Sequence, residues 1–98
     1  MDMNRVYDLV ALRIIVDTVK ECYAVLGVIH NLWQPMPNRF KDYIARSKPN
    51  SYRSLHTTVF AINNKILEIQ IRTEKMHQEN ELGIAAHWAY QQVKSSAE

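Results

Sequence analysis

The feature that most constrains the fold is a nearly unbroken apolar run at Leu9–Val16, interrupted only by Arg13. Its length and its valine and isoleucine content are typical of a strand that is buried on both faces. Just after it, Thr18 and Glu21 have the spacing of a capping box, in which each side chain covers a free backbone N–H of a helix's first turn. The sequence therefore predicts a strand that leads directly into a helix.

The predicted helix carries one apolar stripe and ends before a pair of prolines. The stripe has helical spacing and consists of Val19, Cys22, Tyr23, Leu26, Ile29, His30 and Trp33. Pro35 and Pro37 end the helix, so a loop is expected from Asn38 to about Ser51. Cys22 is the only cysteine and cannot form an internal disulfide, and its place in the stripe indicates a core residue.

A hairpin is predicted in the second half of the chain. Strands are expected at Tyr52–Ala61 and Ile66–Arg72, and Asn63 and Asn64 between them tolerate the positive φ of a tight turn. Alternation gives the second strand one polar face and one apolar face. The polar face consists of Glu68, Gln70 and Arg72.

A last helix is predicted from Thr73 and Glu74 to about Val93, with a side-chain acceptor and a negative charge at its start. Gly83 lies inside this helix, where glycine costs about 1 kcal/mol relative to alanine. We therefore expect close packing against the sheet at Gly83. The order strand, helix, hairpin, helix gives a mixed α/β or α+β domain with a largely antiparallel sheet.

Length and composition fit one small globular domain: 98 residues, 47% apolar and 22% charged. The net charge of +2 favours neither nucleic acid nor membrane as a partner. No apolar run approaches the ~18 residues of a membrane span, and no signal peptide is expected, so a cytoplasmic location is predicted. One segment is locally basic, with Arg39, Lys41, Arg46, Lys48 and Arg53 against the single acid Asp42. It suits a compact anion such as a nucleotide phosphate, although charge alone favours a solvated loop.

Two acidic residues occupy positions typical of metal ligands. Asp8 stands at the mouth of the first strand, and Glu68 lies on the polar face of the last. Such acids commonly hold Mg²⁺ in phosphoryl-transfer sites, because a hard cation takes a few carboxylate oxygens together with waters and substrate phosphates. From spacing alone, a turn acid and an exposed strand acid are the simpler explanation.

The segment Lys48–Thr58 gathers an aromatic ring, an amide, cations and an imidazole. The Tyr52 ring can stack a purine for roughly 1–3 kcal/mol, Asn50 can contact a base edge, and Lys48 can neutralise phosphate. His56 lies on a strand face that can border a pocket. The alternative is a polar loop whose Tyr52 packs on the core, and the residues alone leave both open.

Arg13 is the one charged residue of the apolar strand. Buried arginine is rare unless paired, so its side chain is expected to meet Asp17, Glu68 or a ligand base or phosphate. Strict alternation places Asp8 and Arg13 on opposite strand faces. Both can serve one site only if Asp8 precedes the regular strand or a bulge intervenes.

Six motifs together resemble the synthetase domain of the RelA/SpoT family, almost from end to end. They are Val6–Arg13, Tyr23–Gly27, Arg39–Ala45, Ser54–Val59, Glu68–Thr73 and Gly83–Trp88. The resemblance implies a nucleotidyltransferase-like fold and transfer of the β,γ-pyrophosphate of ATP to the 3′-hydroxyl of GDP or GTP, with Mg²⁺ as cofactor. The product, (p)ppGpp, is the signal of the stringent response.

Matched residue by residue, the resemblance implies three groups of site residues. Asp8 and Glu68 would bind metal and act in catalysis; Lys48, Asn50, Tyr52 and His56 would bind the guanine nucleotide; Arg13 and Lys41 would bind ATP. Within these groups, Glu68 resembles the carboxylate that helps activate the 3′-oxygen. Tyr52 resembles the tyrosine that stacks on guanine.

By the same resemblance, residues 1–98 form the latter half of the family's synthetase domain. In the family, further ATP contacts and a hydrolase domain lie upstream, and regulatory domains follow. The parent enzyme is therefore expected to be ribosome-linked or regulated through those domains. Arg39–Asp42 has a net side-chain charge of +1, from two cations and one acid. It resembles the basic version found in members that both make and hydrolyse (p)ppGpp, which implies a bifunctional parent biased towards GDP.

Two alternatives stay open from the sequence. The chain could bind a guanine nucleotide without turnover, or it could be an interaction domain whose basic loop binds RNA. A truncated domain also exposes surface that its missing helices would cover, so a homodimer is expected.

Overall fold

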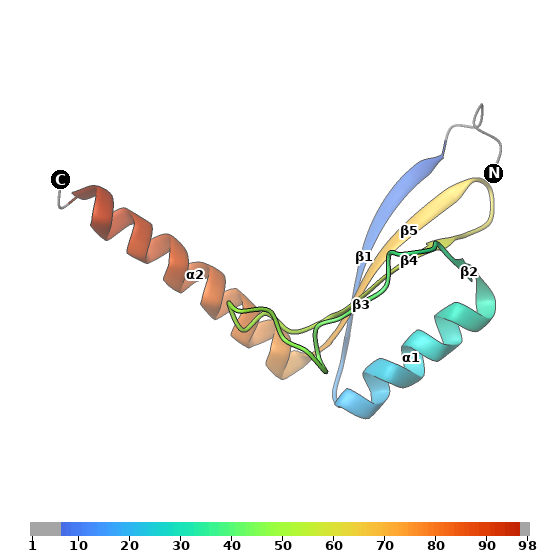
Figure 1. Ribbon diagram of the computed structural model, residues 1–98, viewed down its shortest axis with the longest axis horizontal. Helices are drawn as coiled ribbons and strands as arrows, with labels where there is room; N and C mark the ends of the chain where they lie inside the picture. Colours follow the sequence, from blue (N-terminus) through green and yellow to red (C-terminus); the bar gives the residue numbers. More distant parts are fainter. Residues whose placement is uncertain (1–6, 97–98) are drawn as a thin grey trace.

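The computed structural model describes the backbone of residues 7–96 and the side chains of residues 7–86 and 88. Its elements are β1 (Asp8–Val16), α1 (Val19–Leu32), β2 (Gln34–Pro35), β3 (Lys41–Asp42), β4 (Leu55–Phe60), β5 (Lys65–Thr73) and α2 (Glu74–Ser96). Figure 1 shows α1 along one side of the sheet and α2 extending away from the end of the strands.

The sheet has the strand order β1-β5-β4-β2, and β3 pairs with the other part of β4. The pairing of β1 with β5 is parallel along the whole of both strands, and every other pairing is antiparallel. The largely antiparallel α+β fold predicted from the sequence is therefore confirmed. Because β1 pairs with β5, the first strand of the chain lies beside the last.

The hydrophobic core lies between α1 and the sheet. Its buried members are Cys22, Ile29, Leu55, Val59, Leu67, Ile69 and Ile71. The predicted helix start is confirmed, since the Glu21 amide donates to Thr18 Oγ1 at 3.1 Å. The box is not the reciprocal one predicted, because the Thr18 hydroxyl donates to the Glu21 carboxylate at 3.0 Å.

The prediction that the first strand is buried on both faces is wrong. β1 is the edge strand of the described sheet, and Leu9 and Ile15 on its second face are 64% and 40% exposed. Arg13, which points by alternation to the same side as Leu9 and Ile15, is likewise exposed. The apolar run reflects a strand with one packed face, formed by Val10, Ile14 and Val16, and one uncovered face.

The connections are partly as predicted. Asn63 and Asn64 have φ values of 59° and 58°, as the tight turn between β4 and β5 requires. The short strand β2 precedes the expected loop after Pro37, and β3 lies within that loop. Each of these strands has two residues and is defined only by its pairing with β4, so sequence patterns do not reveal them.

The long helix α2 begins as predicted, with the Met76 amide donating to Thr73 Oγ1 at 3.1 Å. The expected close packing at Gly83 is wrong: a Cβ placed there would meet nothing within 4 Å. The reason is that α2 leaves the sheet after its first turns (Figure 1), so Gly83 faces open space. Among the helices of the described part, none has the length and apolar character needed to cross a membrane.

Candidate active site

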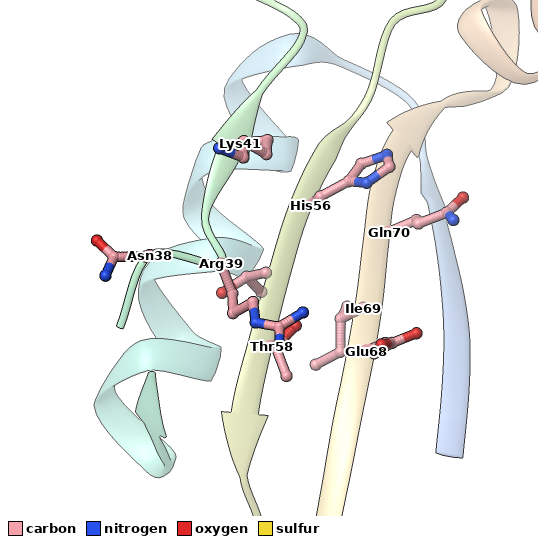
Figure 2. A pocket seen from close by; sticks show the side chains of 9 residues that line it. Asn38, Arg39, Lys41, His56, Thr58, Glu68, Ile69 and Gln70 are labelled. Atoms are coloured by element: carbon pink, nitrogen blue, oxygen red, sulfur yellow. The ribbon is translucent and has the colours of Figure 1, made fainter. Parts of the chain in front are cut away.

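A cavity of about 400 Å³ opens over β4 and β5 on the side of the sheet facing away from α1 (Figure 2). Its lining residues are Asn38, Arg39, Lys41, His56, Thr57, Thr58, Glu68, Ile69 and Gln70. Alternation along β5 turns Glu68 and Gln70 to this side, while Leu67, Ile69 and Ile71 point to the core. The same alternation that builds the core therefore builds the polar floor of the cavity.

The strand register brings polar residues from four strands into one row. Gln70 of β5 pairs with His56 of β4 on one side and with Arg13 of β1 on the other. On the far side of His56, Lys41 of β3 is its partner. Glu68 lies on the same face two residues before Gln70, so a carboxylate borders a row that contains two cations and an imidazole.

The charges along the cavity favour an anionic ligand. Within the described lining, Arg39 and Lys41 are basic and Glu68 is the only acid. Two fixed cations suit a group with several negative charges, such as a nucleotide phosphate. Glu68 is exposed, so its carboxylate is accessible to a metal ion or to a substrate hydroxyl.

Tyr52 is fixed beside the cavity by the contacts of its hydroxyl. Tyr52 Oη lies 2.8 Å from His56 Nε2, donates to Gln70 Oε1 at 3.3 Å and accepts from Arg72 Nη2 at 2.9 Å. Arg72 also donates to Gln70 Oε1. The network thus connects the Tyr52 ring to two residues of the cavity lining, His56 and Gln70.

Tyr43, Tyr52 and His56 form an edge-to-face aromatic cluster. Their ring centroids lie 5.2 to 6.0 Å apart at interplanar angles of 72° to 90°. Lys48 Nζ stands 4.8 Å from the Tyr43 centroid and 5.7 Å from the Tyr52 centroid. This arrangement places a flexible cation beside the aromatic faces, where it can meet the phosphates of a nucleotide whose base stacks there.

The turn before Tyr52 is shaped by Asn50. Its Oδ1 accepts a hydrogen bond from the Tyr52 amide at 3.1 Å, and Ser51 between them has a φ of 67°. Asn50 therefore forms an Asx turn that presents Tyr52. In this structure its amide oxygen is engaged with the backbone.

Arg72 packs against the Tyr52 ring and affects the protonation of His56. Its side chain is 3% exposed, its Cζ lies 5.3 Å from the Tyr52 centroid, and its Nε has no hydrogen-bond partner in the described structure. Burial lowers the pKa of Arg72, although the contact with Tyr52 acts the other way. Burial, together with the positive charges of Arg72 and Lys48, lowers the pKa of His56, so His56 is mainly neutral at pH 7.

The structure brings some of the predicted site residues together and leaves others apart. Lys41, His56 and Glu68 line the cavity, Tyr52 contacts its lining, and Lys48 stands beside Tyr52. Arg13 shares the row of Gln70. Gln70 and Arg72 were not predicted as site residues; the alternating polar pattern from Glu68 to Arg72 was the signal that could have found them.

Asp8 lies apart from the cavity. It begins the unbroken ladder of β1 and pairs with Lys65, so no bulge turns it towards Glu68, and alternation places it on the face opposite Arg13. Within the described residues, no group of three or more His, Cys, Asp or Glu side chains could hold a metal ion. Glu68 is thus a single protein carboxylate at the cavity, and the roles predicted for Asp8 remain predictions.

An α+β domain whose sheet has this topology is a nucleotidyltransferase-like fold of the kind seen in alarmone synthetases. Small alarmone synthetase 2 from Bacillus subtilis superimposes with a TM-score of 0.66 at 31% identity, over 92% of this chain and 51% of that one. Small alarmone synthetase 1 from Bacillus subtilis, solved bound to its product pppGpp, gives 0.66 at 25% identity, over 81% and 44%.

Residues 1–95 match the family described as "Region found in RelA / SpoT proteins". The chain belongs to the RelA/SpoT family. It is 58% identical over 93% of its length to a GTP pyrophosphokinase from Streptomyces antibioticus, and 54% identical over 95% to the bifunctional (p)ppGpp synthase/hydrolase RelA from Mycobacterium tuberculosis. The chain spans only 11% and 13% of the length of these two relatives.

Proposed function

We propose that this chain carries the guanine-nucleotide side of a (p)ppGpp synthetase site, which transfers the β,γ-pyrophosphate of ATP to the 3′-hydroxyl of GDP or GTP and releases AMP. The observation that carries the proposal is the juxtaposition of a fixed tyrosine ring, two cations and one accessible carboxylate along a single cavity. The similarity to proteins named GTP pyrophosphokinase and to a pppGpp-bound synthetase supports the same reaction class.

In the proposed complex, the guanine base stacks on Tyr52, whose ring is held by His56, Gln70 and Arg72. Stacking on an aromatic ring contributes roughly 1–3 kcal/mol. Lys48 stands over the same ring and is proposed to meet the phosphates. His56 is neutral at pH 7, so its ring can contact the nucleotide without adding a charge.

Glu68 is proposed to accept the proton of the attacking 3′-hydroxyl. It is the one carboxylate of the described lining, and it is exposed where the cavity crosses β5. A general base in hydrogen-bond reach of the hydroxyl raises the nucleophilicity of its oxygen. Positioning of the two substrates would supply the remainder of the acceleration, as in other phosphoryl transfers.

Mg²⁺ is the proposed cofactor, and Glu68 is proposed as one of its ligands. Mg²⁺ binds through one or two carboxylates together with substrate phosphates, and Glu68 supplies one such carboxylate beside the cations of the cavity. When bound there, the ion would draw negative charge off the transferring phosphates. Asp8 is proposed as the second ligand, which requires the start of β1 to leave the regular ladder.

Arg13 and Lys41 are proposed as ATP contacts; they stand at the two ends of the polar row. The guanidinium of Arg13 is exposed on the uncovered face of β1, where it can stack on adenine.

We further propose that the parent enzyme acts in the cytoplasm, is bifunctional, and is regulated through domains that this chain does not contain.

A pyrophosphoryl-transfer assay with ATP, GDP and Mg²⁺ tests the proposal. Glu68→Gln should lower turnover by at least about a hundredfold, as expected for loss of a general base. GDP binding, measured by calorimetry, should be retained. Glu74→Gln, an exposed acid at the start of α2, serves as the control. A wild-type chain that binds GDP but gives no turnover would reduce the function to nucleotide binding alone.

A further inference from the structure

We infer that Tyr23 of α1 is a positioning residue for the cavity: through Asp42 it fixes the short strand β3, which carries the wall residue Lys41. Lys41 lines the cavity, whereas Tyr23 and Asp42 do not. The inference concerns how that wall is held. Only its nucleotide-binding consequence rests on the proposed function.

Both carboxylate oxygens of Asp42 are engaged within the chain. Tyr23 Oη donates to Asp42 Oδ2 at 2.7 Å. The amides of Ile44 and Ala45 donate to Oδ1 at 2.9 and 2.8 Å. Asp42 therefore closes a local turn with one oxygen and ties it to α1 with the other, and we assign this carboxylate to the architecture of the loop instead of to a ligand.

The position of this anchor explains why it matters. β3 contains only Lys41 and Asp42, and the segments on both sides, at 37–41 and 45–51, are exposed. Pairing with β4 is therefore short. Beyond it, the segment is held by the bond from the Tyr43 amide to the Ser54 carbonyl at 2.9 Å, by the Phe40 ring 6.2 Å from His30 of α1, and by Ile44, which packs against the core. These contacts are few for a surface segment, and the bond from Tyr23 to Asp42 is the side-chain hydrogen bond between this segment and α1 in the described structure, so it adds to the order of β3.

Asp42 also stands between two residues of the site. On one side, Lys41 pairs with His56 and lines the cavity. On the other, the Tyr43 ring packs against His56 and Tyr52 at centroid distances of 5.2 and 6.0 Å. A shift of Asp42 would therefore move a cavity cation and an edge of the aromatic cluster together.

Charge in the bond is consistent with this role. The hydrogen bond to Asp42, followed by burial, raises the pKa of Tyr23. Burial tends to raise the pKa of Asp42, but the bonds from the Ala45 amide, Tyr23 and the Ile44 amide outweigh it and lower the pKa. A charge-assisted bond is stronger than a neutral one.

The test combines hydrogen exchange with nucleotide binding in Tyr23→Phe, which keeps the ring and removes only the hydroxyl. Loss of one such bond should speed exchange of the Tyr43, Ile44 and Ala45 amides by about two- to tenfold. Asp42→Asn added to Tyr23→Phe should give less than the product of the two single effects. Tyr7→Phe, whose ring packs against Phe60 at 6.3 Å, is the control. In the Asp42→Asn chain, NMR titration should find the pKa of Tyr23 lowered.

If the wild-type chain binds GDP, Tyr23→Phe should weaken binding by a factor similar to the change in exchange. Unchanged exchange at these three amides would overturn the inference, and so would faster exchange with unaltered GDP affinity. If the wild-type chain does not bind GDP, it is the proposed function that fails. The exchange rates and the tyrosine titration then decide the role of Tyr23 on their own.

Discussion

Arg72 is a buried cation whose hydrogen bonds in the described structure go to two neutral groups, the Tyr52 hydroxyl and the Gln70 side-chain carbonyl. A buried guanidinium held by neutral groups is costly, which indicates that its position is set by the site and not by stability. Arg72 holds the hydroxyl of Tyr52, whose ring is proposed to stack on guanine, and its positive charge helps to keep His56 neutral. The functional site thus depends on a residue that lies outside the cavity lining.

The protonation of His56 gives the first prediction. Because Lys48 is exposed and helps to lower the pKa of His56, Lys48→Met should raise that pKa without disturbing the fold, and Arg72→Met should raise it further. Proton NMR of the His56 ring across pH 4 to 8 is the measurement. Arg46→Met removes a cation from the same loop and is the control; equal pKa values in all four chains would contradict the account.

The same shift has a defined consequence for stability. Since the pKa of His56 in the folded chain lies below its unfolded value of about 6.5, the unfolded state binds more protons in the interval between the two values. The contribution of His56 to stability is then complete above that interval and is lost as the pH falls through it. The variants that raise the pKa of His56 should therefore show a weaker loss of unfolding free energy on acidification.

At the scale of elements, local chemistry could be predicted and pairing could not. The helix cap at Thr18, the turn at Asn63 and Asn64 and the start of α2 follow from neighbouring side chains, and each is confirmed. The two-residue strand β3 and the exposed face of β1 depend on which strand lies alongside, so patterns within the segment do not reveal them.

In the candidate site, too, single residues could be predicted from the sequence but their arrangement across strands could not. Glu68, His56 and Lys41 were predicted from motifs and line one cavity. Their place at one cavity follows from the register of β3, β4 and β5, which no single segment encodes. Arg72 was missed because alternation marks it only as polar, whereas its burial accompanies its contacts with the ring and hydroxyl of Tyr52.

The junction between α2 and the segment before β4 gives a second prediction. The Asn80 side chain is 6% exposed; its Oδ1 accepts from the Arg53 amide at 3.2 Å and its Nδ2 donates to the Arg53 carbonyl at 3.1 Å. Asn80→Ala removes both bonds and should lower the free energy of unfolding by about 1–3 kcal/mol in urea titrations. Gln78→Ala, on the exposed side of α2, should change it by less than about 0.5 kcal/mol. Similar values for the two variants would show that the junction is not held by Asn80.

Gly83 supports a third prediction within α2. A Cβ added at Gly83 would meet nothing within 4 Å, and the residue is interior to the helix. Gly83→Ala should therefore increase helix content by circular dichroism and stabilise the chain by up to about 1 kcal/mol. Gly27→Ala, equally unobstructed in α1, is a matched comparison. A destabilising Gly83→Ala would mean that something packs against α2 at this position.

At the scale of the whole molecule, the projecting helix leaves apolar surface uncovered. Ile84 and Trp88, which lie four residues apart and therefore on one face of α2, are 63% and 65% exposed, and Figure 1 shows this part of α2 clear of the sheet. We predict that the isolated chain self-associates through this surface, since exposed apolar patches mark contact sites. Light scattering after size exclusion should give a dimer that Ile84→Asp converts to a monomer. A wild-type monomer at high concentration would contradict this prediction.

The central claim, that Tyr52 forms a platform for a guanine nucleotide in this chain, is tested most directly by calorimetric titration with GDP in Mg²⁺ buffer. The wild-type chain should bind, Tyr52→Ala should lose roughly 1–3 kcal/mol of binding free energy, and Tyr52→Phe, which keeps the ring, should lose less. Equal affinities of the wild type and Tyr52→Ala, or no binding by a folded wild-type chain, would contradict the claim.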